Sequence, residues 1–246
     1  MNISTIIKIE YTKLFRRSNV LFLFLFLYLM LTPIQMIPHQ FIGDSSVNYF
    51  DLLKPTLRYI SIFGMLLMAI FLVNNTGNDF NEGSYRKNLA VGLTKKDYFT
   101  GKLLLIFFFS IFVIVFTIFS YLLLGKLAYK LSLYSLFKEM MSVNLLNQFL
   151  ALFNAGLFGL FFITVFRNRI IGLVFFPFWL ITEFSAFLLE KSETLRLYTH
   201  FWPGQAGFNL YNSLVFDLEA LLIIIVISII FVTSAWLGLL WREEKS

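Results

Sequence analysis

Long apolar runs alternate with short polar connections along nearly the whole chain. A helix needs roughly 20 apolar residues to cross a hydrocarbon core about 30 Å thick. Runs near that length lie at residues 20–37, 59–74, 103–125, 145–166, 170–189 and 217–241. The pattern predicts an all-α integral membrane protein: a single transmembrane domain over 1–246, with six transmembrane helices and both termini on the same side.

The first nineteen residues follow a different pattern, in which apolar side chains recur every three or four positions with basic side chains between them. The apolar positions are Ile3, Ile6, Ile7, Tyr11 and Leu14, and the basic ones are Lys8, Lys13, Arg16 and Arg17. This spacing predicts an amphipathic helix over 1–19 that lies in the membrane interface, with Lys13, Arg16 and Arg17 on its polar side. The alternative is a frayed basic tail that only sets topology.

Lysine and arginine are distributed unevenly between the two sides of this layout. One side, which holds both termini and the segment 75–102, carries thirteen of them, and the other side carries seven. Because cytoplasmic loops of membrane proteins are enriched in these residues, the first side is predicted to be cytoplasmic.

Composition supports a membrane location, since 59% of the residues are hydrophobic and only 14% are charged. The net charge of +6 comes from short loops and not from one basic surface, so we expect the lipid bilayer as partner and no nucleic acid. The 32 phenylalanines fit an AT-rich bacterial source. We therefore expect a multi-pass protein of the bacterial cytoplasmic (inner) membrane.

Two of the outer connections have features of their own. The connection after residue 125 has apolar side chains at helical spacing, which predicts a helix on the outer surface. The connection at 190–216 is long and moderately apolar. It is interpreted either as a re-entrant excursion into the outer leaflet or as an ordinary surface loop.

The residues needed for most enzyme chemistry are missing. The chain has no cysteine, and its two histidines, His39 and His200, fall in predicted outer loops. No zinc site of the His and Cys type and no Gly-rich phosphate loop can be assembled. We expect no enzyme activity, no metal and no cofactor bound by this chain.

A few polar side chains fall inside the predicted spans, where burying them is costly. Glu183 and Asn154 are the candidate pathway residues. The alternatives are a carboxylate that reaches the outer headgroups or is protonated against another helix, and an amide that hydrogen-bonds between helices. Gly156 and Gly159 are interpreted as close-packing positions.

One well-mixed polar segment, residues 78–102, separates the second and third apolar runs and carries five basic and three acidic residues. A helix over 80–93 would have one apolar and one charged side, and Thr94 would cap a second helix that begins at Lys95. The apolar side is Phe80, Leu89 and Leu93, and the charged side is Glu82, Arg86 and Lys87. The alternative is a solvated loop that sets topology.

The sequence of this segment, "EGSYRKNLAVGLTKKDYFTGK", resembles the segment seen after the second span of ABC-2 type permeases. These proteins are the membrane subunits of ATP-binding-cassette exporters. The shared pattern is an acidic residue, Gly, Ser or Thr, any residue and Arg, followed by Leu, Gly, Ser or Thr, Lys or Arg, an aromatic residue and Lys. The amphipathic start, six spans, inside termini and long last outer connection resemble the same family over essentially the whole chain.

The resemblance implies that segment 75–102 couples the membrane part to two cytosolic ATPase subunits, which bind ATP and Mg. The matching coupling positions are Glu82, Gly83, Ser84, Tyr85, Arg86, Lys87 and Leu89. It also implies pairing with a second permease, either a copy of this chain or a paralogue, and an N-terminal helix against the ATPase.

The substrate that the resemblance implies is amphipathic or apolar: a drug, a bacteriocin or lantibiotic, or a lipid-like molecule. The alternative function is a membrane assembly or signalling subunit that binds a cytosolic partner through the same segment and transports nothing.

Overall fold

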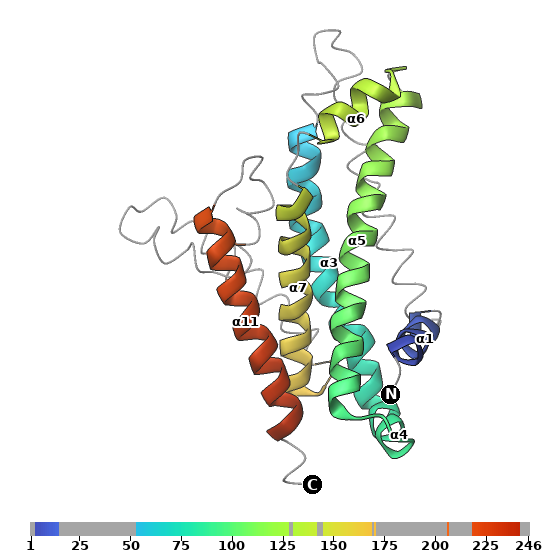
Figure 1. The fold of residues 1–246 in the computed structure, drawn as a ribbon, viewed down its shortest axis with the longest axis vertical. Coiled ribbons are helices and arrows are strands. Elements are labelled where there is room, and N and C mark those ends of the chain that lie inside the picture. The colour runs from blue at the N-terminus through green and yellow to red at the C-terminus, as the bar shows by residue number, and fades with distance from the viewer. Residues whose placement is uncertain are drawn as a thin grey trace.

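Apolar helices of 22 to 33 residues form the body of the molecule in its computed structural model. The structure describes residues 3–14, 53–127, 130–141, 145–168, 170, 206 and 218–241, and the secondary structure in these ranges is helical (Figure 1). The helices are α1 (Ile3–Leu14), α3 (Leu53–Asn81), α4 (Ser84–Ala90), α5 (Lys95–Leu127), α6 (Leu133–Met141), α7 (Leu145–Phe166) and α11 (Leu218–Trp241).

Three of the described helices, α5, α7 and α11, are long and apolar enough to cross a membrane, which indicates a multi-pass membrane protein. The predicted runs at 145–166 and 217–241 match α7 and α11 to within one residue, and those at 59–74 and 103–125 lie inside α3 and α5. The other two predicted runs lie outside the described residues, apart from Ile170. Six spans therefore stay a prediction.

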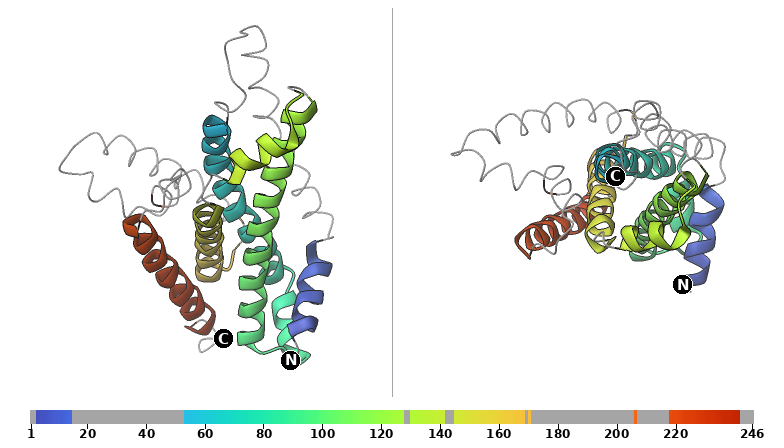
Figure 2. Two further views of the ribbon diagram at one scale, coloured as in Figure 1. Left: turned by 45° about the horizontal axis from the view of Figure 1, so that its top comes forward. Right: turned by 90° about the horizontal axis from the view of Figure 1, so that it is seen from above.

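Helix α7 is central in the described bundle. It packs against α3, α5 and α11, while α1 packs against α5. Seen from above, α11 and α5 lie on different sides of α7 (Figure 2). Helix α7 is accordingly buried along most of its length.

Two glycines on α7 make this close packing possible. A Cβ atom at Gly159 would lie 2.5 Å from the backbone oxygen of Ala69 on α3, and one at Gly156 would lie 2.6 Å from Cγ2 of Ile106 on α5. No larger residue fits at either position without movement of its neighbour. The prediction that both glycines are close-packing positions is confirmed.

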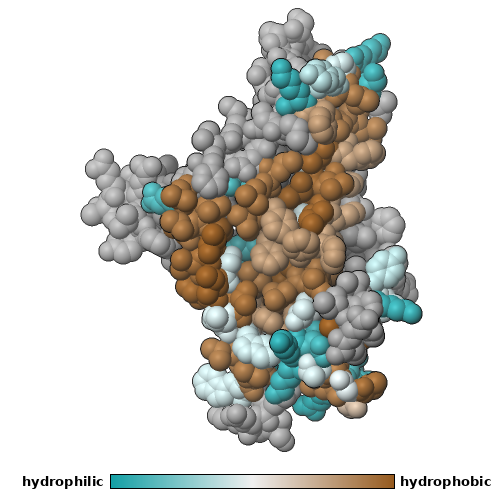
Figure 3. Space-filling model, viewed as in Figure 1, coloured by the Kyte–Doolittle hydropathy of each residue, from teal (hydrophilic) through white to brown (hydrophobic). Residues whose placement is uncertain are grey.

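The bundle has two distinct ends. Helices α1 and α4 and the end of α11 lie together at one end, and α6 lies at the other (Figures 1 and 2). We call these the α4 end and the α6 end. Between them the surface over α5, α7 and α11 is hydrophobic, whereas hydrophilic side chains gather at both ends (Figure 3). Helix α5, with 33 residues, is about 50 Å long and exceeds the thickness of a hydrocarbon core.

Three predicted helices can be compared with the structure. The connection after residue 125 contains a helix, α6, as predicted. The predicted helix over 80–93 is wrong in both of its bounds, because α3 continues to Asn81, the chain turns at Gly83 and α4 is limited to Ser84–Ala90. Gly83 has a φ of +67°, a left-handed conformation that ends one helix before the next begins. Within the predicted helix over 1–19, residues 3–14 form α1, and the other positions lie outside the described residues.

Candidate functional site

Helix α4 is held between two turns that its sequence specifies. After α4, Gly92 has a φ of +98°, again left-handed. Thr94 and Asp97 then form a capping box: the backbone N of Asp97 donates to Thr94 Oγ1 over 3.1 Å, and the backbone N of Thr94 donates to Asp97 Oδ2 over 3.1 Å. The predicted cap on the helix that begins at Lys95 is confirmed.

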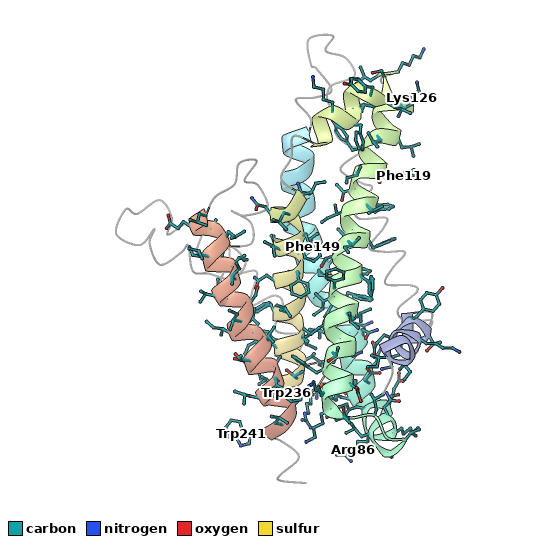
Figure 4. All side chains as sticks on the ribbon, viewed as in Figure 1. Arg86, Phe119, Lys126, Phe149, Trp236 and Trp241 are labelled. Atoms are coloured by element: carbon teal, nitrogen blue, oxygen red, sulfur yellow. The ribbon has the colours of Figure 1, made fainter. Side chains whose placement is uncertain are left out.

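One side of the α4 segment is charged and faces away from the bundle. The side chains of Glu82, Arg86 and Lys87 are exposed, and Arg86 lies at the α4 end of the molecule (Figure 4). Leu93 is buried and Leu89 is half-buried against the hydrophobic core. The predicted division into a charged side and an apolar side is therefore confirmed, although the helix is shorter than predicted.

Tyr85 differs from the other predicted coupling residues, because its side chain is only 3% exposed. Its ring meets the ring of Phe80 edge to face at 5.2 Å and that of Tyr98 at 4.8 Å between centroids. Tyr85 thus attaches α4 to the end of α3 and the start of α5, and it does not present its ring to a partner. Gly83 and Ser84 are half-buried at the start of the helix.

Close to α4, four charged side chains from three helices form a buried group, which we call the four-charge cluster. Its members are Glu10 and Lys13 on α1, Asp79 on α3 and Lys102 on α5. Lys13 Nζ lies 2.9 Å from Glu10 Oε1 and 2.9 Å from Asp79 Oδ2. Lys102 Nζ lies 2.9 Å from Glu10 Oε2 and 2.8 Å from Asp79 Oδ2. Two cations and two anions are therefore interleaved.

Further polar groups complete the four-charge cluster. Lys102 also donates to Asn75 Oδ1 over 2.7 Å, and the hydroxyl of Tyr98 donates to Asp79 Oδ2 over 3.2 Å. The Nζ atoms of Lys13 and Lys102 lie 5.5 and 5.3 Å from the centre of the Tyr98 ring. Tyr98 therefore contacts both the four-charge cluster and Tyr85, the residue that attaches α4 to the bundle.

Burial makes the balance of charge in this cluster important. Asp79 and Lys102 are 0% exposed, and Glu10 and Lys13 are 6% and 5% exposed. Burial by itself raises the pKa of Asp79, but Lys102 and Lys13 outweigh it and leave that pKa below its ordinary value. A buried charge that loses its partner is strongly destabilising, so the cluster holds α1, α3 and α5 in one arrangement.

The predicted role of Lys13 on the polar side of an interfacial helix is wrong, because Lys13 is buried in the four-charge cluster. Helix α1 approaches α5 closely at Gly101, where a Cβ atom would lie 2.8 Å from Cγ2 of Ile6. Tyr11, expected on the apolar side, is 59% exposed. Helical spacing identified an amphipathic segment but not which polar side chains would meet oppositely charged groups on other helices.

The remaining predicted site residues fall into two groups. Asn154 is buried on α7, and its Oδ1 accepts a hydrogen bond of 3.0 Å from Ser228 Oγ on α11, which agrees with the interhelical alternative. Arg16, Arg17 and Glu183 lie outside the described residues, as does 190–216 except Ala206. Within the described ranges, no group of three or more metal-ligating side chains is present.

Sequence reasoning missed the four-charge cluster as a unit. The available signal was the run "NNTGND" at 74–79, which continues an apolar helix directly with polar side chains. Asn75, Thr76 and Asp79 in this run are buried.

Comparisons of the chain with protein-family models, curated proteins and solved structures found no match.

Proposed function

We propose that this chain is the permease subunit of an ATP-binding-cassette exporter and that α4 is the element that docks on a cytosolic ATPase. One observation carries the proposal: α4 exposes Arg86 and Lys87, and the turn before it exposes Glu82, while Tyr85 of α4 is buried against α3 and α5. A force applied to the charged side is therefore delivered to the bundle through a packed contact.

The chemistry of the exposed side fits a protein groove that carries both signs of charge. Arg86 and Lys87 suit carboxylates, and Glu82 suits a lysine or arginine, through charge-assisted hydrogen bonds. In the proposed assembly two ATPase subunits bind ATP and Mg, a second permease copy or paralogue completes the pathway, and this chain binds no cofactor. The resemblance of residues 82–102 to ABC-2 type permeases supports the same assignment.

The proposed mechanism needs only a difference between two states of the ATPase. When ATP binding closes the ATPase dimer, α4 moves with the groove that holds it. Helices α3 and α5 move with α4 because the Tyr85 ring packs against Phe80 of α3 at 5.2 Å and Tyr98 of α5 at 4.8 Å. The free energy is supplied by nucleotide binding and hydrolysis in the partner. The transported molecule is amphipathic or apolar, such as a drug, a bacteriocin or lantibiotic, or a lipid-like compound.

The proposal expects a separate P-loop ATPase to be encoded beside this gene, and the test is co-purification with that product, followed by measurement of ATP hydrolysis and export in vesicles. We expect Arg86→Glu and Glu82→Lys each to weaken association at least tenfold, the effect of about 1.4 kcal/mol. Lys138→Glu is the matched control for Arg86→Glu, because it makes the same change of charge on an exposed side chain of α6, at the opposite end of the bundle.

Association and ATP turnover that are indifferent to both α4 variants would contradict the proposal. Association that depends on α4 without any export of candidate peptides, lipids or drugs would favour the non-transporting assembly or signalling subunit.

A further inference from the structure

Arg167, at the end of α7, joins elements that are far apart in the sequence. Its guanidinium donates to two carbonyl oxygens of α11, that of Gly238 over 3.3 Å and that of Leu239 over 3.0 Å. Helix α11 ends at Trp241, so Gly238 and Leu239 lie in its last turn. The last four carbonyls of a helix lack partners within the helix, and a cation there is favourable. Arg167 therefore caps α11 from the neighbouring helix.

The same guanidinium also lies against Phe80 and Tyr85, the two aromatic rings that attach α4 to α3. Its central carbon is 5.6 Å from the centre of the Phe80 ring and 6.0 Å from that of the Tyr85 ring. These are the two rings that meet edge to face where α4 joins α3. Arg167 therefore contacts α11 through hydrogen bonds and the α3–α4 junction through the faces of aromatic rings.

The backbone of Arg167 indicates that these contacts hold the residue in place. Its φ is +49°, a left-handed backbone conformation that residues other than glycine, asparagine and aspartate rarely adopt. The backbone N of Arg167 still donates to the carbonyl of Ile163 over 2.8 Å, which completes the last turn of α7. An unfavourable conformation of this kind persists only where the surroundings fix it.

We propose that Arg167 is the positioning residue that transmits displacement of α4 to the α7–α11 pair. The four-charge cluster connects α1, α3 and α5, whereas Arg167 connects Phe80 and Tyr85 to the two helices on the other side of the bundle. The inference rests on the proposed function and adds to it the route by which movement of the docking helix reaches α11.

The chemistry of the site requires arginine. A planar guanidinium donates to two carbonyls with its edge while its face covers aromatic rings, and a lysine ammonium is a point charge that cannot do both. Arg167→Lys therefore keeps the charge but loses most of the link. Arg167→Asn tolerates the left-handed backbone and removes the side chain that spans the elements.

The test uses the full chain together with its ATPase. Because the sequence contains no cysteine, spin labels attached to the purified chain before assembly, at Ala90→Cys on α4 and Trp241→Cys on α11, are the only labels on it, and both positions are exposed. We expect the label-to-label distance to shift with nucleotide in the wild-type background. With Arg167→Asn, α4 should move without α11, so the nucleotide-dependent change in the label-to-label distance should be larger than in wild type. Substrate exported per ATP should fall at least fivefold, while ATPase association is unchanged.

Two further variants keep the test informative if Arg167→Asn folds poorly. Phe80→Leu removes a ring face but leaves both hydrogen bonds of Arg167, and it should lower export per ATP as Arg167→Lys does, to an intermediate value. Lys126→Asn, at the α6 end of α5, is the matched control and should behave as wild type (Figure 4).

The outcomes separate the two proposals. An Arg167→Asn protein that associates, couples export to ATP normally and keeps the wild-type distance change would overturn the role of Arg167 alone. A wild-type chain that associates with no ATPase would overturn the proposed function, and the transmission role of Arg167 with it.

Discussion

Lys102 is a lysine with no exposed surface, held by oxygen atoms of Glu10, Asp79 and Asn75. Because both carboxylates are also bound by Lys13, removing Lys102 leaves two buried anions with one cation. The cost of an uncompensated buried charge is much larger than the net gain from forming the pair. The four-charge cluster therefore contributes mainly by penalising every arrangement in which α1 is displaced.

We predict that Lys102→Met destabilises the protein by about 3–5 kcal/mol, the range observed when one partner of a buried ion pair is removed. The measurement is the unfolding free energy in detergent. Lys126→Met is the matched control, since it makes the same change in the same helix at an exposed position. Equal stability of the two variants would show that the cluster does not restrain α1.

The residue scale is also where sequence reasoning was weakest. Lys13 and Lys102 count as two positive charges when loops are compared, and nothing in their neighbouring residues distinguishes them from exposed lysines. Their partners lie up to 92 positions away in the chain. The burial of Tyr85, which was predicted only as a coupling position, and the contacts of Arg167 were missed for the same reason, because they depend on how helices are placed against one another and not on local spacing.

At the scale of the helices, α7 meets α3 and α5 through glycines of unequal tolerance. The obstacle beside Gly159 is the backbone of Ala69, which moves only if all of α3 moves. The obstacle beside Gly156 is mainly the Ile106 side chain, with Met68 also close by. Side chains can change rotamer, whereas a helix backbone cannot yield locally.

We therefore predict that Gly159→Ala destabilises the protein more than Gly156→Ala, with the larger effect in the range of about 1–3 kcal/mol expected for overpacking. Thermal unfolding of the two variants in the same detergent measures the difference. The reverse order would mean that α3 and α7 are less closely packed than this structure has them.

The ends of the helices show which helix limits can be predicted from the pattern of apolar residues. The limits of α7 and α11 follow directly from where the apolar runs begin and end. Helix α3 does not end with its apolar run at residue 74, because Asn75, Thr76 and Asp79 are buried by neighbouring helices and stay helical. Polar residues predict a loop only when they face water, and burial of this run depends on α1 and α5.

At the scale of the whole molecule, the predicted orientation places the α4 end in the cytoplasm and the α6 end outside the cell, so the two ends should differ in their accessibility to reagents added outside. Val91, beside α4, is 89% exposed and Tyr134, on α6, is 79% exposed. In intact cells a membrane-impermeant maleimide should label Tyr134→Cys readily, and it should label Val91→Cys only after the membrane is permeabilised. Native cysteine gives no background, since the chain has none. The opposite pattern would reverse the orientation derived from the basic residues.

The long sequence separations within the four-charge cluster have a consequence for biogenesis. Glu10 and Lys13 are synthesised first, but Asp79 follows Lys13 by 66 residues and Lys102 follows Glu10 by 92. At roughly 5–20 residues per second, the ribosome needs about 5–20 s to supply the last member. Helix α1 is thus made well before α3 and α5, and it can be seated only once the third predicted span begins to emerge.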